Sequence, residues 1–317
     1  MKSFSFLFLW IVALLLLTPT DGWAWGRHGH SLICQMAAYL AAGDHGGEGL
    51  KAHAYDLGYY CNVPDFVWKK PATYEVERVQ HYMDIDLFEK AFAKRPEVKS
   101  PLGLSRADFD KQFPELSLSS GRAWWRMREL NERMHGFSEQ LSAADSPRGK
   151  ERHVLQKKWL VTAGVLGHYV GDMSMPLHVT ENHDGQATQQ RGIHFFFEDV
   201  CVNEIYPSLQ DKVWREARGQ WPAFAKKNSN RYLPDMLIEL VQSSFKSIPQ
   251  LLAIDKANPR SNIKVACKKF EPLIIKRLVA STLVLGEMYR REFTWTMDDD
   301  RFYLFDYEPE YIAPGKD

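Results

Sequence analysis

The sequence lacks an excess of charge of either sign and lacks several common catalytic motifs. Its 317 residues include 40 basic and 40 acidic side chains, so the formal net charge is zero. A neutral chain does not hold polyanions by bulk electrostatics. No Gly-x-Ser-x-Gly segment, P-loop or dinucleotide-binding glycine motif occurs in it. Nothing therefore supports a serine hydrolase, a P-loop enzyme or a dinucleotide-dependent enzyme.

Long apolar runs are scarce, and the longest lies at the N-terminus. Residues 4–17 are almost wholly apolar and follow Lys2, while Gly22 and Ala24 occupy the −3 and −1 positions of a cleavage site. This order of segments is typical of a secretory signal peptide. The alternative is a retained membrane anchor, but the run is shorter than the roughly 20 residues that a spanning helix needs. We expect residues 1–24 to be removed, and the exported domain, secreted or periplasmic, to span residues 25–317 without a transmembrane segment.

Cysteine is also rare, with four residues at Cys34, Cys61, Cys201 and Cys267. In an exported protein an even number of cysteines indicates two disulfides, which can connect in three ways. Four buried thiols are the alternative, which is weaker outside the cytoplasm. We expect the pairs Cys34–Cys61 and Cys201–Cys267.

Strand patterns are scarce, whereas helical periodicity recurs along the chain. Apolar residues within residues 30–42 fall on one helix face, and similar faces occur at about 124–141, 154–173, 237–252 and 270–289. Residues 44–49 are rich in glycine, and residues 95–120 mix Pro, Ser, Gly and charge, so both stretches are expected to be loops. No repeat or linker divides the sequence. We predict an all-α fold, a single multi-helix domain with long loops.

The most informative motif lies in residues 166–178. His168 and Asp172 are four residues apart, so they share one helix face, and an imidazole and a carboxylate placed in this way can bind one metal ion. Pro176 is expected to end the helix and to allow His178 to return to the same region. The alternative is a structural hydrogen-bonded pair, which is the more common case for one such pair alone.

A second pair with the same spacing, His194 and Glu198, follows within about thirty residues. The three phenylalanines between them are also compatible with a simple core and a satisfied buried histidine. Two such pairs with His178 between them are difficult to explain by coincidence. Their mixed nitrogen and oxygen ligands suit zinc better than calcium or magnesium.

Three more segments contain candidate ligands. Asp65 follows a proline in a segment suited to a rigid turn, and His81 has Asp84 and Asp86 nearby; neither segment is specific by itself. At the predicted mature start, Trp25 would carry a free α-amino group with a pKa of about 8, which can lose its proton and bind metal. Its amine and carbonyl form a five-membered chelate, and His30 supplies the next ligand. A disordered terminus is the alternative.

The Trp-Gly-x-x-Gly-His start together with His-x-x-x-Asp-x-x-x-Pro-x-His resembles the zinc-dependent phospholipases C and the single-strand-specific zinc nucleases, which form one superfamily. The likeness extends from residue 25 to about residue 199 and implies a largely helical, exported protein with three zinc ions. The implied ligands are Asp65, His81, His168 and Asp172 for one ion, Trp25 and His30 for a second that shares Asp172, and His178, His194 and Glu198 for the third. Cys34 and Cys61 also match a disulfide of the plant nucleases.

The resemblance implies a hydrolase of phosphodiester bonds. Two zinc ions that share Asp172 lower the pKa of a water, and the resulting hydroxide attacks phosphorus, while the third ion neutralises negative charge. Asp65 and Asp172 are the implied catalytic residues, and Asp65 also orients the nucleophile. Tyr82 and Asp84 are expected to bind the non-phosphate part of the substrate; the alternative is that Tyr82 is simply packed.

Two departures from the nuclease pattern bear on the substrate. The nucleases carry Asp where this chain has Glu198, as the phospholipases do, and their Gly-Gly-Asn stretch is absent. We therefore favour a phospholipase C. His28 replaces the acid that helps the phospholipases to hold choline, so with Arg27 and Arg78 it favours an anionic headgroup; the alternative is that all three are ordinary surface charges.

Two other functions stay open. The start and the first two cysteines look more like the nucleases, so a single-strand-specific endonuclease or 3′-nucleotidase acting on nucleic acid or nucleotides is the first alternative. A non-catalytic zinc-binding protein is the second; nine ligands for three ions leave room for water, which favours an enzyme. The aromatic stretch 302–311 is either a flap over the substrate or a packed terminus. No obligate protein partner is evident.

Overall fold

The computed structural model describes residues 25–43, 47–297 and 309–315. The predicted signal peptide lies outside these residues. Within them the chain is mainly helical, and the one β-type pairing is an isolated bridge between Met83 and Gly121. The prediction of a single all-α domain is confirmed. Its assignment to the zinc phosphoesterase superfamily stays a prediction.

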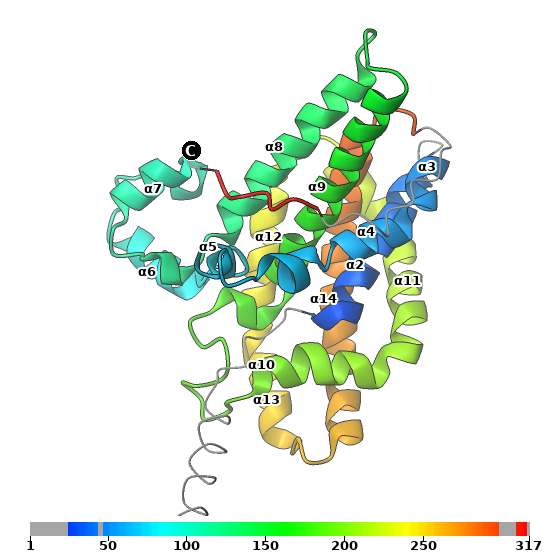
Figure 1. Ribbon diagram of the computed structural model, residues 1–317. Helices are drawn as coiled ribbons and strands as arrows, with labels where there is room; N and C mark the ends of the chain where they lie inside the picture. The colour runs from blue at the N-terminus through cyan, green and yellow to red at the C-terminus, as the bar shows by residue number, and fades with distance from the viewer. Residues whose placement is uncertain (1–24, 44–46, 298–308, 316–317) are drawn as a thin grey trace, which may run out of the picture.

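Five long helices form the body of the molecule (Figure 1). α14 (Ile263–Glu292) packs against α2 (Gly26–Ala42), α9 (Lys150–Ser174) and α11 (Cys201–Asn228), and α8 (Ala123–Ser142) packs along α9. Every residue of α9 from Trp159 onward is buried, so this half of the helix is covered on all sides. A polar residue in this half of α9 is therefore held inside the protein, away from water.

Shorter helices cover the ends and sides of this body. Their bounds are α3 (Glu48–Ala52), α4 (Ala54–Tyr60), α5 (Tyr74–Glu77), α6 (Ile85–Ala93), α7 (Arg106–Gln112), α10 (Ile193–Phe195), α12 (Leu233–Phe245) and α13 (Ile248–Ala257). None of the helices in the described ranges combines the length and the apolar character needed to cross a bilayer.

The prediction of a loop over residues 95–120 is wrong in part, because this stretch contains α7. Ser105 caps the helix by accepting a hydrogen bond from the backbone N–H of Asp108. Phe109 and Phe113 are fully buried, and their ring centroids lie 5.0 Å apart. The burial of these two aromatic rings thus stabilises a helix in a segment whose average composition is typical of a loop.

Both expected disulfides are confirmed. Cys34 of α2 is bonded to Cys61, directly after α4, and Cys201 at the start of α11 is bonded to Cys267 of α14. All four residues are fully buried. The first bond ties together two segments that carry predicted metal ligands, whereas the second joins two body helices.

Replacing Cys201 and Cys267 by serine is expected to destabilise the protein without changing its metal content. The bond closes a loop with a sequence separation of 66 residues. A cross-link of this span lowers the entropy of the unfolded chain and stabilises the fold by about 4 kcal/mol. Urea denaturation at matched zinc content measures the difference, and an unchanged midpoint would argue against this estimate.

Candidate metal centre

The buried end of α9 holds the central pair, His168 and Asp172. Neither residue is exposed to solvent. α9 ends at Ser174, two residues before Pro176, and His178 follows within a 3₁₀ turn, Pro176–Val179. Proline thus ends the helix as expected, and His178 returns beside the segment that contains His81, because its Nδ1 lies 2.5 Å from the His81 carbonyl oxygen.

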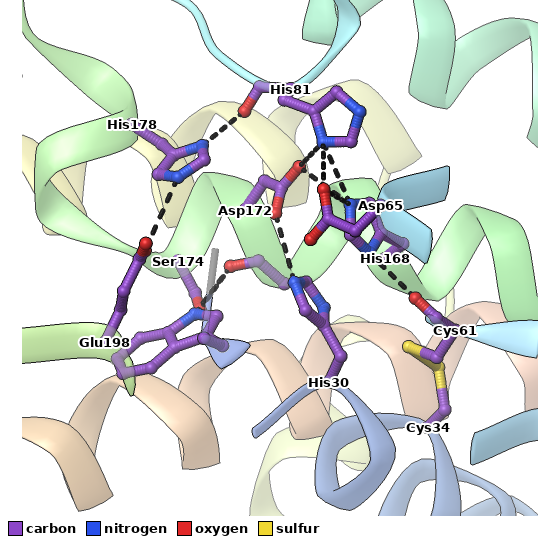
Figure 2. Close-up of polar contacts among 12 residues, drawn as sticks. His30, Cys34, Cys61, Asp65, His81, His168, Asp172, Ser174, His178 and Glu198 are labelled. Atoms are coloured by element: carbon purple, nitrogen blue, oxygen red, sulfur yellow. Dashed lines mark hydrogen bonds and ion pairs between the residues drawn. A yellow bond between two sulfur atoms is a disulfide. The ribbon is translucent and has the colours of Figure 1, made fainter. Parts of the chain in front are cut away.

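A first cluster surrounds Asp172 and draws its residues from four segments (Figure 2). His81 Nδ1 lies 3.1 Å and His168 Nε2 lies 3.4 Å from Asp172 Oδ2. His30 Nε2, from α2, lies 3.4 Å from the other oxygen, Oδ1. The two oxygens of Asp172 therefore face different histidines.

Asp65 completes this first cluster from a single π-helical turn, Pro64–Trp68. Its Oδ1 lies 3.6 Å from His81 Nδ1 and 3.8 Å from His168 Nε2. Lys69 Nζ donates to the same oxygen at 2.7 Å. The described residues thus contain two overlapping groups that could hold metal ions, namely His30, His168 and Asp172, and Asp65, His81 and His168.

The second cluster joins His178 to the other predicted pair. His194 Nε2 lies 3.1 Å and His178 Nε2 lies 3.6 Å from Glu198 Oε2. Figure 2 shows His178 and Glu198 beside the first cluster. This is the third group that could hold a metal ion. The structure therefore brings all eight predicted side-chain ligands into two adjacent clusters.

Unpartnered polar atoms in both clusters fit a bound cation. Buried polar atoms normally form hydrogen bonds, and leaving one without a partner costs about 1–3 kcal/mol. Within the described part of the chain, both oxygens of Asp172, both oxygens of Glu198 and the Nε2 atoms of His30, His178 and His194 have no hydrogen-bond partner. Metal ions bound in the two clusters would satisfy these atoms.

Three of the histidines are oriented by backbone carbonyl groups. His168 Nδ1 lies 2.7 Å from the Cys61 carbonyl oxygen, and His194 Nδ1 lies 2.7 Å from that of His183. His178 Nδ1 faces the His81 carbonyl oxygen in the same way. Donation at Nδ1 leaves the lone pair on Nε2, which faces the carboxylates in each case. This is the usual arrangement of a histidine that binds metal.

Burial and neighbouring charge keep the central pair in the protonation state that metal binding needs. Burial lowers the pKa of His168 to about 3, and His30 adds to this shift. Burial alone would raise the pKa of Asp172, but His168, His30 and His81 hold it well below its usual range. A neutral imidazole and an ionised carboxylate are the ligand forms that bind metal.

Trp25 joins the start of α2 to the end of α9. Its side chain is fully buried, and its indole Nε1 donates to the Gly171 carbonyl oxygen at 2.8 Å and to Ser174 Oγ at 3.0 Å. These bonds hold the indole of Trp25 against the end of α9 that carries Asp172. Coordination of metal by Trp25 stays a prediction.

Gly26→Ala is expected to weaken metal binding and to lower stability by about 1–2 kcal/mol, the cost of a side chain in left-handed backbone. Gly26 has φ +50°, and a Cβ there would lie 2.6 Å from Asp199 Oδ1. The matched control is Gly219→Ala in α11, where a Cβ meets nothing within 4 Å. That change should stabilise the helix by about 0.5–1 kcal/mol. Thermal unfolding and zinc analysis of both variants test the prediction; equal effects would refute it.

The two predicted substrate residues lie on the segment between the clusters. Tyr82 is half-buried and Asp84 is buried, and the intervening Met83 donates its N–H to the His178 carbonyl oxygen at 3.0 Å. Burial, Asp86 and Glu181 raise the pKa of Asp84 to about 8. Their contact with substrate stays a prediction.

A groove of about 320 Å³ beside the first cluster was not predicted from the sequence. Its lining residues are Arg27, Ser31, Gln35, Tyr55, Tyr59, Asn62, Val63, Phe66 and Val67. Ser31 follows His30 and Phe66 follows Asp65 in the chain, and Tyr55, Tyr59 and Phe66 are exposed. Tyr55 and Tyr59 are four residues apart and lie on one face of α4, and this spacing could have indicated the groove from the sequence.

Comparison of the chain with models of protein families, with curated proteins and with solved structures found no match.

Proposed function

We propose that this protein is a zinc-dependent phosphoesterase related to the phospholipases C and single-strand-specific zinc nucleases, and that it acts after export. The proposal rests on the orientation of the two Asp172 carboxylate oxygens, which face different histidines. One oxygen faces His30, and the other faces His81 and His168. A carboxylate placed in this way can bridge two metal ions, which is the arrangement of two-metal phosphoester hydrolases.

Zinc suits these clusters better than a hard cation. Tetrahedral zinc with bonds of about 2.0–2.2 Å places neighbouring ligand atoms about 3.3–3.6 Å apart. The contacts around Asp172 measure 3.1–3.4 Å, and those around Glu198 measure 3.1 and 3.6 Å. Five imidazoles among the predicted ligands exceed what calcium or magnesium sites use. The three groups of candidate ligands would hold three ions, provided that the Trp25 amine completes the site of His30 and Asp172.

The residues of the chain have separate tasks in hydrolysis. Bound zinc would lower the pKa of a water and neutralise charge that develops on the phosphoryl group. His81, His168 and His30 would hold the ions, and Asp172 would set their separation. Asp65 uses Oδ1 toward Lys69, His81 and His168, so its Oδ2 would accept a hydrogen bond from an attacking water and orient it.

For the substrate we favour a phospholipid with an anionic headgroup. Glu198 stands where the phospholipases carry Glu, and the groove beside the first cluster combines the cationic Arg27 with three exposed aromatic rings. The same rings favour the nuclease alternative in one respect, since aromatic side chains can stack on bases. The substrate test therefore includes both classes.

The test uses protein that begins at Trp25, loaded with zinc and assayed against vesicles of single phospholipids, single-stranded DNA and 3′-AMP. Diacylglycerol release supports the favoured substrate. Release of short nucleotides or inorganic phosphate without diacylglycerol supports the nuclease alternative. If the zinc-loaded protein hydrolyses none of these, a zinc-binding protein without catalysis becomes the better description.

A further inference from the structure

Glu77 lies behind His81, on the side away from the clustered carboxylates. Its side chain is fully buried, and Oε1 lies 3.4 Å from His81 Nε2. Neither His81 Nε2 nor Glu77 Oε2 has a hydrogen-bond partner among the residues that the structure describes. The opposite ring nitrogen, Nδ1, is the atom that faces Asp172 and Asp65. Glu77 and the clusters thus contact opposite edges of one imidazole ring.

His81 differs from His168, His178 and His194 in the group that orients it. His168, His178 and His194 present Nε2 to the carboxylates and turn Nδ1 toward a backbone carbonyl. If Nδ1 of His81 binds metal, the neutral ring carries its proton on Nε2, and the buried carboxylate of Glu77 lies at that nitrogen. A carboxylate there fixes the tautomer, holds the ring and makes the opposite nitrogen a better metal ligand.

We propose that Glu77 is a positioning residue that fixes the tautomer and orientation of His81. The inference rests on the proposed metal-dependent function, because positioning His81 has this consequence only if His81 binds metal. Glu77 itself contacts no substrate.

The surroundings of Glu77 are built to hold its carboxylate in place. The Tyr169 hydroxyl, from α9, donates to Glu77 Oε1. The guanidinium of Arg126 lies 5.4 Å from the centre of the Tyr169 ring, and Arg126 is fully buried. Arg126 also donates to the carbonyl oxygen of Ile312, so the C-terminal segment reaches this network.

Residues 309–315, the red segment in Figure 1, also contact the turn Pro64–Trp68. Trp68 donates its indole N–H to the Pro309 carbonyl oxygen at 3.3 Å, and its ring meets Tyr311 edge-on with 5.3 Å between centroids. Trp68 ends the turn that carries Asp65. The C-terminal segment therefore supports His81 through Arg126 and Asp65 through Trp68.

Glu77→Gln is the direct test, since it keeps the size of the side chain and removes its charge. We expect the zinc affinity of the site that contains His81 to fall about 10–100-fold, the usual effect of altering a group that orients a ligand. Tyr169→Phe should cause a smaller loss at the same site. Since Tyr169 acts through Glu77, the double variant should bind no more weakly than Glu77→Gln alone. Glu75→Gln, at an exposed ion pair with Arg78 on the same short helix, is the control.

Competition with a zinc chelator measures affinity, and ¹⁵N NMR of the histidine rings reports the tautomer of His81. A merely structural role for Glu77 would leave that tautomer unchanged. Equal affinity and an unchanged tautomer in Glu77→Gln would overturn the inference while leaving the proposed function intact. If the wild-type protein binds no zinc, the proposed function itself fails. Should Glu77→Gln not fold, Tyr169→Phe decides, and wild-type affinity in that variant overturns the inference.

Discussion

Asp172→Asn is expected to remove metal from two sites at once and to abolish phosphoester hydrolysis. Each oxygen of Asp172 faces a different set of histidines, so neutralising this side chain weakens both sets. Groups that only orient ligands already change metal affinity by about 10–100-fold. Loss of a charged ligand shared by two ions should lower affinity by about 100-fold or more. Elemental analysis after gel filtration should find close to one zinc ion per chain in place of three.

Two controls separate this effect from a general loss of structure. Asp211→Asn makes the same chemical change at an exposed position of α11, and His135→Ala removes an exposed histidine that pairs with Glu292 at 2.8 Å. Both variants should keep full metal content and activity. If Asp172→Asn also kept three ions, the bridging role would be wrong.

A form that keeps even one residue before Trp25 is expected to lose the ion bound by His30 and to lose activity with it. The extra residue converts the α-amine into an amide, whose nitrogen has no available lone pair. The indole of Trp25 is anchored to Gly171 and Ser174, so the chain cannot shift to present another amine in its place. Zinc analysis and phosphoester assays of proteins with and without an N-terminal extension measure the difference.

Cleavage of the extended protein provides the matched control. An extension that ends in a protease site directly before Trp25 can be removed after folding, and the same molecules should then take up one more zinc ion and become active. An extended form with full zinc content and activity would show that the α-amine is not a ligand.

The two histidine–carboxylate pairs of the metal clusters were predictable because their spacing follows local rules, whereas Asp65 and His81 were assigned only through the family resemblance. The four-residue spacings of His168 with Asp172 and of His194 with Glu198 place each pair on one helical face, and Pro176 stops α9 where His178 must turn back. Helix periodicity likewise predicted α2, α8, α9 and α14, but it did not predict α11. These features depend on neighbours within a few turns, which the sequence displays directly.

Features that depend on distant contacts were not predictable. Glu77 and Tyr169 are 92 residues apart, and Arg126 meets Ile312 across 186 residues. No spacing rule links such pairs. α7 was missed for a similar reason, since its packing relies on Phe109, which is covered by the distant residues Phe88 and Trp125. The open question about the C-terminal aromatic stretch is answered only for Tyr311, which packs on Trp68.

Diffraction from crystals of the zinc-loaded protein, recorded on both sides of the zinc absorption edge, tests the central claim most directly. We predict three anomalous peaks: two on opposite sides of Asp172, and one among His178, His194 and Glu198. Absence of a peak at both clusters, with Asp172 accepting hydrogen bonds directly from protonated histidines, would contradict the account.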